Sequence, residues 1–175
     1  MAFFLASWVI LIIGWIIHVL VDHHSNKRTA HRVIELLLLW LLVTTGVFGL
    51  FGGIAHISGM SGSLAVQIGY APSMFQWEVG WGDIALSVLL IGCAWQRLRD
   101  GWMTAAIVVM LIQYGGDGIG HIIQYSAHHN TAESNVWAIP SDIIVPIVAV
   151  ILLFIYRRGE KATGSSETGS SDGQS

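Results

Sequence analysis

Five stretches of mostly apolar residues, separated by short polar connections, divide the chain. They cover approximately residues 2–21, 33–54, 79–95, 102–125 and 137–156. A helix needs about 20 mostly apolar residues to cross the hydrocarbon core of a membrane. The pattern therefore predicts an all-α fold, a polytopic membrane helix bundle with five transmembrane helices.

The basic residues indicate how the predicted bundle is oriented. All eight lie on alternate connections: Lys27, Arg28 and Arg32 before the second helix, Arg97 and Arg99 before the fourth, and Arg157, Arg158 and Lys161 after the fifth. Short loops rich in Lys and Arg remain in the cytoplasm. We therefore expect the N-terminus outside and the C-terminus in the cytoplasm (N-out/C-in).

The composition agrees with the lipid bilayer as the main surroundings of the chain. Of the 175 residues, 54% are hydrophobic and 11% are charged, whereas soluble domains carry about 25% charged residues. We expect one transmembrane domain at residues 1–158 and a disordered, Gly/Ser-rich cytoplasmic tail at 159–175. Residues 2–21 lack the basic start and the small-residue cleavage site of a signal peptide, so we expect a retained first helix. The sequence contains no basic patch of the kind that binds nucleic acid, so we do not expect nucleic acid as a partner.

Acidic residues gather on the outer side of the predicted bundle, where the sequence places no Lys or Arg. The outer half and the outer loops hold five acids: Glu78, Asp83, Asp117, Glu133 and Asp142. A carboxylate in the hydrocarbon region costs roughly 2.5–3.5 kcal/mol. Such acids are tolerated when they are protonated, share a bound cation or face water. Each case indicates a negatively polarised cavity that opens outward.

The predicted helix at 102–125 carries a polar stripe. Side chains that recur at steps of three and four residues share one face of a helix. Here these steps connect Gln113, Asp117, His121, Gln124 and His128. The spacing of Asp117 and His121 allows the carboxylate to orient the imidazole, or both groups to bind one metal ion. Gly116 and Gly120, on the other side, would allow a neighbouring helix to approach closely.

Other segments add further candidates. Glu78 and Asp83 are about 140° apart around a helix, so both cannot face one narrow site. Asp142 either belongs to the site or starts the last helix, where an acid favours the positive end of the helix dipole. The outer connection at 55–76, which contains His56, is a loose loop, a short interfacial helix or a lid.

Three short motifs lie in the second half of the chain. They are FQWEVGWGDIALS from Phe75, GIGHI ending at Ile122, and SDI at 141–143. Together they resemble a family of small bacterial and archaeal membrane proteins, the domain of unknown function 6790. Members of that family usually have Arg at the position of Trp77 and Asn at that of Asp83, so this chain is the more acidic one.

The resemblance implies the helix-bundle topology and the inner or plasma membrane of a prokaryotic cell. It also points to Glu78, His121 and Asp142 as site residues. It implies no activity. The preferred hypothesis from the residues is an outward-facing intramembrane site that binds or moves a cation or a proton. We expect Glu78, Asp83, Asp117, His121 and Asp142 to form it. Accessory candidates are His56, Gln113, Gln124 and His128.

Several alternatives stay open. A divalent metal ion would use Glu78, Asp117 and His121, a carboxylate and imidazole set that suits Zn²⁺, Mn²⁺ or Fe²⁺. Such a metal could serve a membrane enzyme, although no recognised hydrolase or transferase motif favours one. A bis-histidine haem would pair His121 with His56 or His18. A non-catalytic membrane subunit or scaffold needs no ligand, and a transporter of five helices implies a homo-oligomer.

Overall fold

Every regular element of the described residues is a helix. The computed structural model describes residues 1–95 and 99–168, and the side chains of 1–95 and 101–159. The elements are α1 (Ala2–Val21), α2 (Ala30–Ile57), α3 (Ser61–Gln67), α4 (Phe75–Gly92), α5 (Arg99–His128), α6 (Glu133–Val136) and α7 (Ala138–Thr168). The predicted all-α class is confirmed.

All five predicted long helices are present, although most of their ends differ from the prediction. Among the described residues, four helical stretches are long and apolar enough to cross a membrane: α1, α2, α5 from Gly101 onward, and Glu133–Gly159, which includes most of α7. α4 is not among them; its 18 residues include Glu78 and Asp83. The structure thus supports a membrane protein with four apolar helices, and the fifth span stays a prediction.

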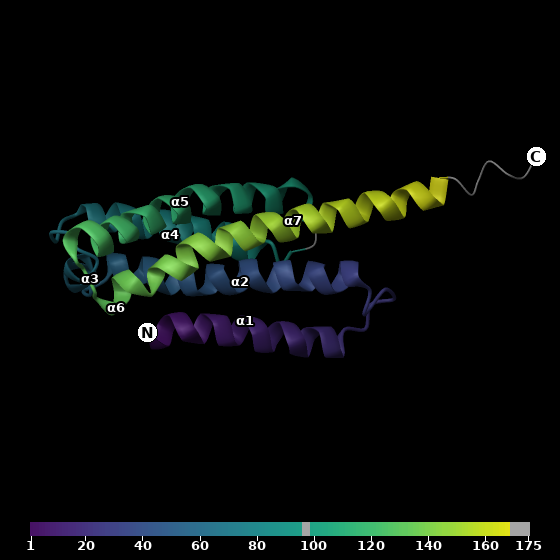
Figure 1. Cartoon of the computed structure of the whole chain (residues 1–175), viewed down its shortest axis with the longest axis horizontal. Helices are drawn as coiled ribbons and strands as arrows, with labels where there is room; N and C mark the ends of the chain where they lie inside the picture. Colours follow the sequence, from purple (N-terminus) through teal and green to yellow (C-terminus); the bar gives the residue numbers. More distant parts are fainter. Residues whose placement is uncertain (96–98, 169–175) are drawn as a thin grey trace, which may run out of the picture.

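α2 is the central helix of the bundle (Figure 1). It packs most extensively against α4 and also against α1 and α7, while α5 packs chiefly against α7. The short helices α3 and α6 lie at the end of the bundle where the chain starts, and the C-terminal part of α7 extends beyond the opposite end. The connection between α1 and α2 therefore lies at the opposite end of the bundle from α3 and α6.

Glycines allow α2 and α4 to approach closely. A Cβ built on Gly53 would lie 2.8 Å from the carbonyl oxygen of Gly80, and a Cβ on Gly80 would lie 2.7 Å from that of Gly53. These distances leave no room for a side chain, so the two backbones are in direct contact. Small residues serve helix packing in this way in membranes, where no water drives apolar surfaces together.

The role that we predicted for Gly116 and Gly120 of α5 is wrong. A Cβ on Gly116 would meet no other atom within 4 Å, and one on Gly120 would meet only the hydroxyl of Tyr70, at 3.6 Å. The intervening Gly118 packs closely instead, against Ile143 of α7. The prediction failed because the face of α5 that carries Gly116 and Gly120 points into a cavity and not toward a neighbouring helix.

The core lies between α2, α4, α5 and α7 and is built from apolar side chains. Its fully buried members include Leu38, Leu42, Leu86, Leu90 and Met110. Cys93 is also buried in this core. Many large apolar side chains point outward instead, such as Ile13, Ile112 and Phe154. An apolar exterior of this kind suits lipid.

The connection between α1 and α2 contains a compact ion network. Arg32 lies 2.8 Å from a carboxylate oxygen of Asp22 and 2.8 Å from one of Glu35. Thr29 caps α2 by accepting a hydrogen bond from the backbone N–H of Arg32. Hydrogen bonding to the guanidinium lowers the pKa of Asp22, which lies just outside α1, from 3.8 to about 2. The network joins the ends of the two helices.

The last helix continues into the predicted tail. We expected disorder from Gly159 onward, but α7 extends to Thr168. Helix propagation adds one hydrogen bond for each residue that is fixed, so a long helix can continue through a polar segment once it has started. The remaining part of the predicted tail, 169–175, lies outside the described residues.

Candidate functional site

A large cavity lies between the helices at the end of the bundle that holds α3 and α6. Its volume is about 840 Å³, and all seven helices contribute residues to its wall. α3 and the residues after it cover part of the cavity, through Leu64, Gln67 and Tyr70. Of the three interpretations of the 55–76 connection, the structure therefore supports the short helix, which is α3 and lies at the cavity wall.

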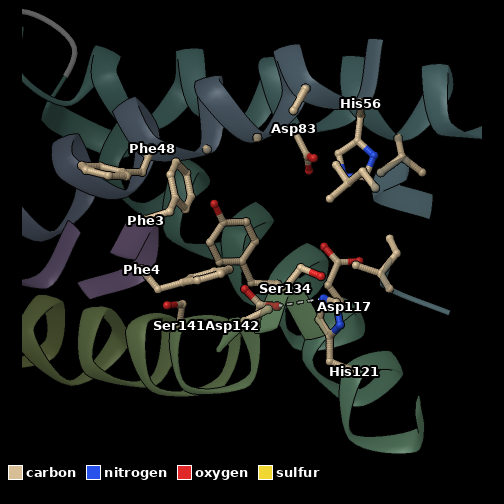
Figure 2. A pocket seen from close by; sticks show the side chains of 18 of the residues that line it. Phe3, Phe4, Phe48, His56, Asp83, Asp117, His121, Ser134, Ser141 and Asp142 are labelled. Atoms are coloured by element: carbon tan, nitrogen blue, oxygen red, sulfur yellow. Dashed lines mark ion pairs between the residues drawn. The ribbon is translucent and has the colours of Figure 1, made fainter. Parts of the chain in front are cut away.

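Three carboxylates from three different helices face this cavity (Figure 2). Asp83 comes from α4, Asp117 from α5 and Asp142 from α7. No Lys or Arg occurs among the described residues that line the wall. The N-terminal ammonium of Met1 also lies at this wall, where it pairs with Glu133, and Asp117 is solvent-exposed. Three further carboxylates that share one space still attract positive charge.

Hydrogen bonds to a buried amide determine the orientation of His121. The side-chain nitrogen of the fully buried Asn135 donates to the backbone carbonyls of His121, at 3.3 Å, and Asn130, at 3.0 Å. The amide oxygen of Asn135 must then be the acceptor for Nδ1 of His121, 2.8 Å away. This arrangement assigns the Nδ1–H tautomer to the neutral imidazole.

The other nitrogen of His121 is therefore available for chemistry. Nε2 lies 3.7 Å from a carboxylate oxygen of Asp142, an approach marked by the dashed line in Figure 2. In a neutral imidazole Nε2 carries a lone pair, which a proton or a cation can use. Once protonated, Nε2 becomes a donor that faces Asp142. The pair can hold one proton between an imidazole and a carboxylate.

His56 of α2 is held by a second buried amide. Its Nδ1 lies 2.6 Å from Oε1 of Gln76, whose side chain is buried at the start of α4. Asp117 lies between His56 and His121 in Figure 2 and forms no hydrogen bond to another described residue. Two imidazoles that are oriented by amides, rather than by charges, thus flank an unpartnered carboxylate.

Other polar groups at the cavity also lack partners. The hydroxyl oxygen of Ser134 is buried and has no hydrogen-bond partner among the described residues. Tyr114 is partly buried and lines the same cavity, and its hydroxyl forms no hydrogen bond within the described part of the chain. Buried polar groups in folded proteins are nearly always hydrogen-bonded to protein or to an ordered molecule. These two groups are available to an occupant.

The wall that α1 and α2 contribute is aromatic. Phe3 and Phe4 of α1 pack edge to face, and Phe3 packs in the same way against Phe48 of α2, with ring centroids 5.1 Å apart. Trp8 of α1 extends this wall toward the core. The aromatic residues thus lie on one side of the cavity, with Asp83 and Asp117 on the other (Figure 2). Asp142 lies between the two sides in this view, close to Phe4.

Residues 1–162 match a known protein family, described as "Family of unknown function (DUF6790)". The chain belongs to this family. No curated protein and no solved structure matches the chain. The resemblance seen in the three short motifs is therefore confirmed and extends over nearly the whole length of this DUF6790 member.

The structure brings together part of the site that we predicted. Asp83, Asp117, His121, Asp142 and His56 all line the cavity of this DUF6790 protein. Gln113 lies behind them and donates a 2.6 Å hydrogen bond to Asp83. Two further accessory candidates are not lining residues: the side chain of Gln124 lies against Gly69, and His128 is exposed.

The predicted metal set of Glu78, Asp117 and His121 is not brought together. Glu78 is exposed and does not line the cavity. The angle of about 140° between Glu78 and Asp83 explains this difference, because Asp83 occupies the inward face of α4. Among the residues that the structure describes, no three His, Cys, Asp or Glu side chains form a group that could hold a metal ion.

Two important residues of the site were not predicted from the sequence. Gln76 and Asn135 hold the two imidazoles, and both are buried. Gln76 belongs to the FQWE motif, which was a usable signal. Asn135 lies in a polar loop segment of the sequence, where burial cannot be predicted from the neighbouring residues. His18, one haem candidate, accepts a hydrogen bond from Trp40 and lies outside the cavity wall.

Proposed function

We propose that this DUF6790 member is a five-span protein of a prokaryotic cell membrane whose outward-facing cavity binds a cation. The N-terminus is outside and the C-terminus is in the cytoplasm. The observation that carries the proposal is that Asp83, Asp117 and Asp142 meet in one cavity without Lys or Arg among the described lining residues. A positively charged occupant would supply the counter-charge for these carboxylates.

The proposal includes α4 as the fifth span. Its low hydropathy comes partly from Asp83, which faces the cavity rather than lipid and bonds to Gln113. Polar residues in membrane helices commonly face the bundle interior or a water-filled space. α4 also packs against α2 at Gly53 and Gly80, so it belongs to the same bundle.

Cysteine labelling tests the orientation. Cys93 is buried, and a Cys93→Ser background allows single cysteines to be placed at the exposed positions Ser63, in α3, and Ser25, between α1 and α2. A membrane-impermeant maleimide added to intact cells should label Ser63→Cys and should label Ser25→Cys only after lysis. The opposite pattern would contradict the N-out arrangement, and labelling of both in intact cells would contradict five spans.

Binding measurements test the site. Purified protein in lipid nanodiscs is titrated with Na⁺, Ca²⁺, Mn²⁺, Zn²⁺ and an organic cation, tetraphenylphosphonium. At least one cation should bind saturably, and Asp117→Asn with Asp142→Asn should weaken binding roughly ten- to a hundredfold, the value of one or two charge-assisted contacts. Glu78→Gln is the matched control, because Glu78 is exposed outside the cavity. Equal binding in all variants would overturn the proposal.

A proton is the second candidate occupant. The specific observation in its favour is the pair formed by Nε2 of His121 and Asp142, 3.7 Å apart. If the protein bound no metal or organic cation but took up protons in a manner that His121→Gln abolished, this candidate would replace the first.

A further inference from the structure

We propose that the occupant of the cavity is an organic, amphipathic cation rather than an inorganic ion. This inference rests on the proposed function, because it names the chemical class of the cation. Its apolar body would lie against the aromatic wall of Phe4, Trp8 and Phe48, and its charge would lie beside Asp117 and Asp142.

The volume of the cavity is the first reason. At about 840 Å³, it falls within the range of roughly 300–1,000 Å³ that is typical of sites for small organic molecules. One water molecule occupies about 30 Å³ of liquid. A metal ion, even with its coordinated water, would fill only a small part of this space.

The spacing of the acidic residues is the second reason. A bare divalent ion needs several oxygen or nitrogen ligands within about 2–2.6 Å of one point. The described residues provide no group of three such side chains. Carboxylates that come from different helices and surround a wide space can still attract an ammonium, phosphonium or guanidinium group, because a diffuse charge requires no fixed coordination geometry.

The aromatic wall is the third reason. An inorganic ion gains little from apolar side chains, which would only remove its water. An organic cation gains from burial of its apolar surface, at about 25 cal/mol per Å², and from contact of its charge with the faces of aromatic rings. Four aromatic residues of the cavity wall can provide both kinds of contact: Phe3, Phe4, Phe48 and Trp8.

The unpartnered hydroxyl groups are an independent observation that indicates an occupant. The oxygen of Ser134 is buried without a partner, and the hydroxyl of Tyr114 also has none within the described residues. Both residues lie at the cavity wall. A polar substituent on the apolar body of the occupant, or water that it brings, would satisfy these groups.

Separate titrations with two probes of similar shape, one charged and one neutral, test the inference. Tetraphenylphosphonium carries the charge, and triphenylphosphine oxide is its neutral analogue; both are titrated against the full chain in nanodiscs. We expect saturable binding of tetraphenylphosphonium at least about tenfold tighter than that of the neutral analogue, since loss of the charge removes a contact of about 1.5–3 kcal/mol. Asp117→Glu should retain binding, which separates loss of charge from misfolding.

Variants of the aromatic wall complete the test. Phe4→Ala should weaken tetraphenylphosphonium binding about tenfold and leave Ca²⁺ and Zn²⁺ titrations unchanged, because only an apolar body uses the ring. Phe4→Leu should have a smaller effect. Trp77→Ala is the matched control, since Trp77 is an exposed aromatic residue outside the cavity wall.

The other outcomes show whether this inference alone fails or whether the proposed function fails with it. If Ca²⁺ or Zn²⁺ binds in an Asp117-dependent manner and tetraphenylphosphonium does not bind, the proposed function stands and this inference is overturned. If the neutral analogue binds as tightly as the cation and the Asp→Asn variants change nothing, the cavity is an apolar site and both proposals fail. Both also fail if neither metal ions nor tetraphenylphosphonium bind.

Discussion

The carboxylates at the two ends of the helix bundle differ in whether they have a guanidinium partner. At the end where α1 meets α2, a guanidinium lies against two carboxylates, in the network of Arg32 with Asp22 and Glu35. At the end that holds the cavity, the carboxylates of Asp83, Asp117 and Asp142 have no Lys or Arg beside them in the described wall. The first arrangement joins the ends of two helices, and the second is the basis of the proposed cation site.

The difference teaches which residues to associate with function in a chain of this composition. A carboxylate that already has a guanidinium gains little from a ligand, whereas an unpartnered carboxylate at a cavity has a large unsatisfied electrostatic interaction. The cavity end also uses neutral amides, Gln76 and Asn135, to hold its imidazoles. Amides orient a histidine without cancelling the charge of the neighbouring acids.

The largest expected effect is on the amide support at the cavity end. Asn135→Ala removes partners from Nδ1 of His121 and from two backbone carbonyls, and leaving a buried polar group unsatisfied costs about 1–3 kcal/mol. We expect the free energy of unfolding to fall by about 3 kcal/mol, measured by thermal unfolding in detergent. Ser126→Ala, on an exposed face of α5, is the control. A change equal to that of the control would show that the amide does not hold the site.

The next largest loss of stability is expected at the end of the bundle where Arg32 pairs with Asp22 and Glu35, here called the paired end. Arg32→Ala removes the guanidinium from Glu35 and Asp22, and loss of the charge-assisted bond to Glu35 alone costs about 2 kcal/mol. Thermal unfolding should show this loss, while tetraphenylphosphonium binding remains as in the unaltered protein. Arg28→Ala, an exposed residue with no ion pair among the described residues, is the control. Altered binding in Arg32→Ala would break the contrast between the two ends.

A smaller effect of opposite sign is expected in the cavity. Asp117→Asn removes one of three acidic side chains from a shared space, so the protein without ligand should become more stable, by about 1 kcal/mol. Stabilisation on loss of a functional group is the usual trade-off between activity and stability. Glu78→Gln should leave the unfolding temperature unchanged. If Asp117→Asn destabilised the protein as Arg32→Ala does, Asp117 would be a structural residue.

The smallest effect concerns acid pH at the paired end. The pKa of Asp22 is about 2 in the fold, below its ordinary value of 3.8, so the folded state favours the ionised carboxylate. Its contribution to stability is present above the ordinary pKa and is lost as the pH falls through about 2. The unfolding temperature of Asp22→Asn should lie below that of the unaltered protein at about pH 5, and the gap should close toward pH 2. A gap independent of pH would contradict this assignment.

The fold was largely predictable because the membrane imposes a simple rule on apolar length. The long helices follow from segments of about 20 apolar residues, and the predicted and observed bounds of α1 agree. The ends of α2, α5 and α7 were less predictable, because polar residues at a helix end can still be helical when the end is capped. The start of α2, capped by Thr29, is an example.

The candidate site was predictable only in part, since periodicity places a residue on one helix but does not say which helices meet. The step of four residues correctly put Asp117 and His121 on one wall, and the angle between Glu78 and Asp83 correctly separated these two acids. The grouping of Glu78 with His121 failed because it required knowledge of how α4 is rotated against α5. The aromatic wall of α1 was missed because its residues resemble any lipid-facing segment.

α1 is the helix least fixed to the rest of the bundle, and this has a consequence for how the cavity is filled. It packs mainly against α2 and has one buried residue, Leu11, in its whole length, yet its first two turns form the aromatic wall. Elements with few buried contacts separate from a fold at low free energy. An amphipathic molecule dissolved in the adjacent lipid can therefore enter sideways, past α1, so its concentration in the lipid rather than in water would set the occupancy.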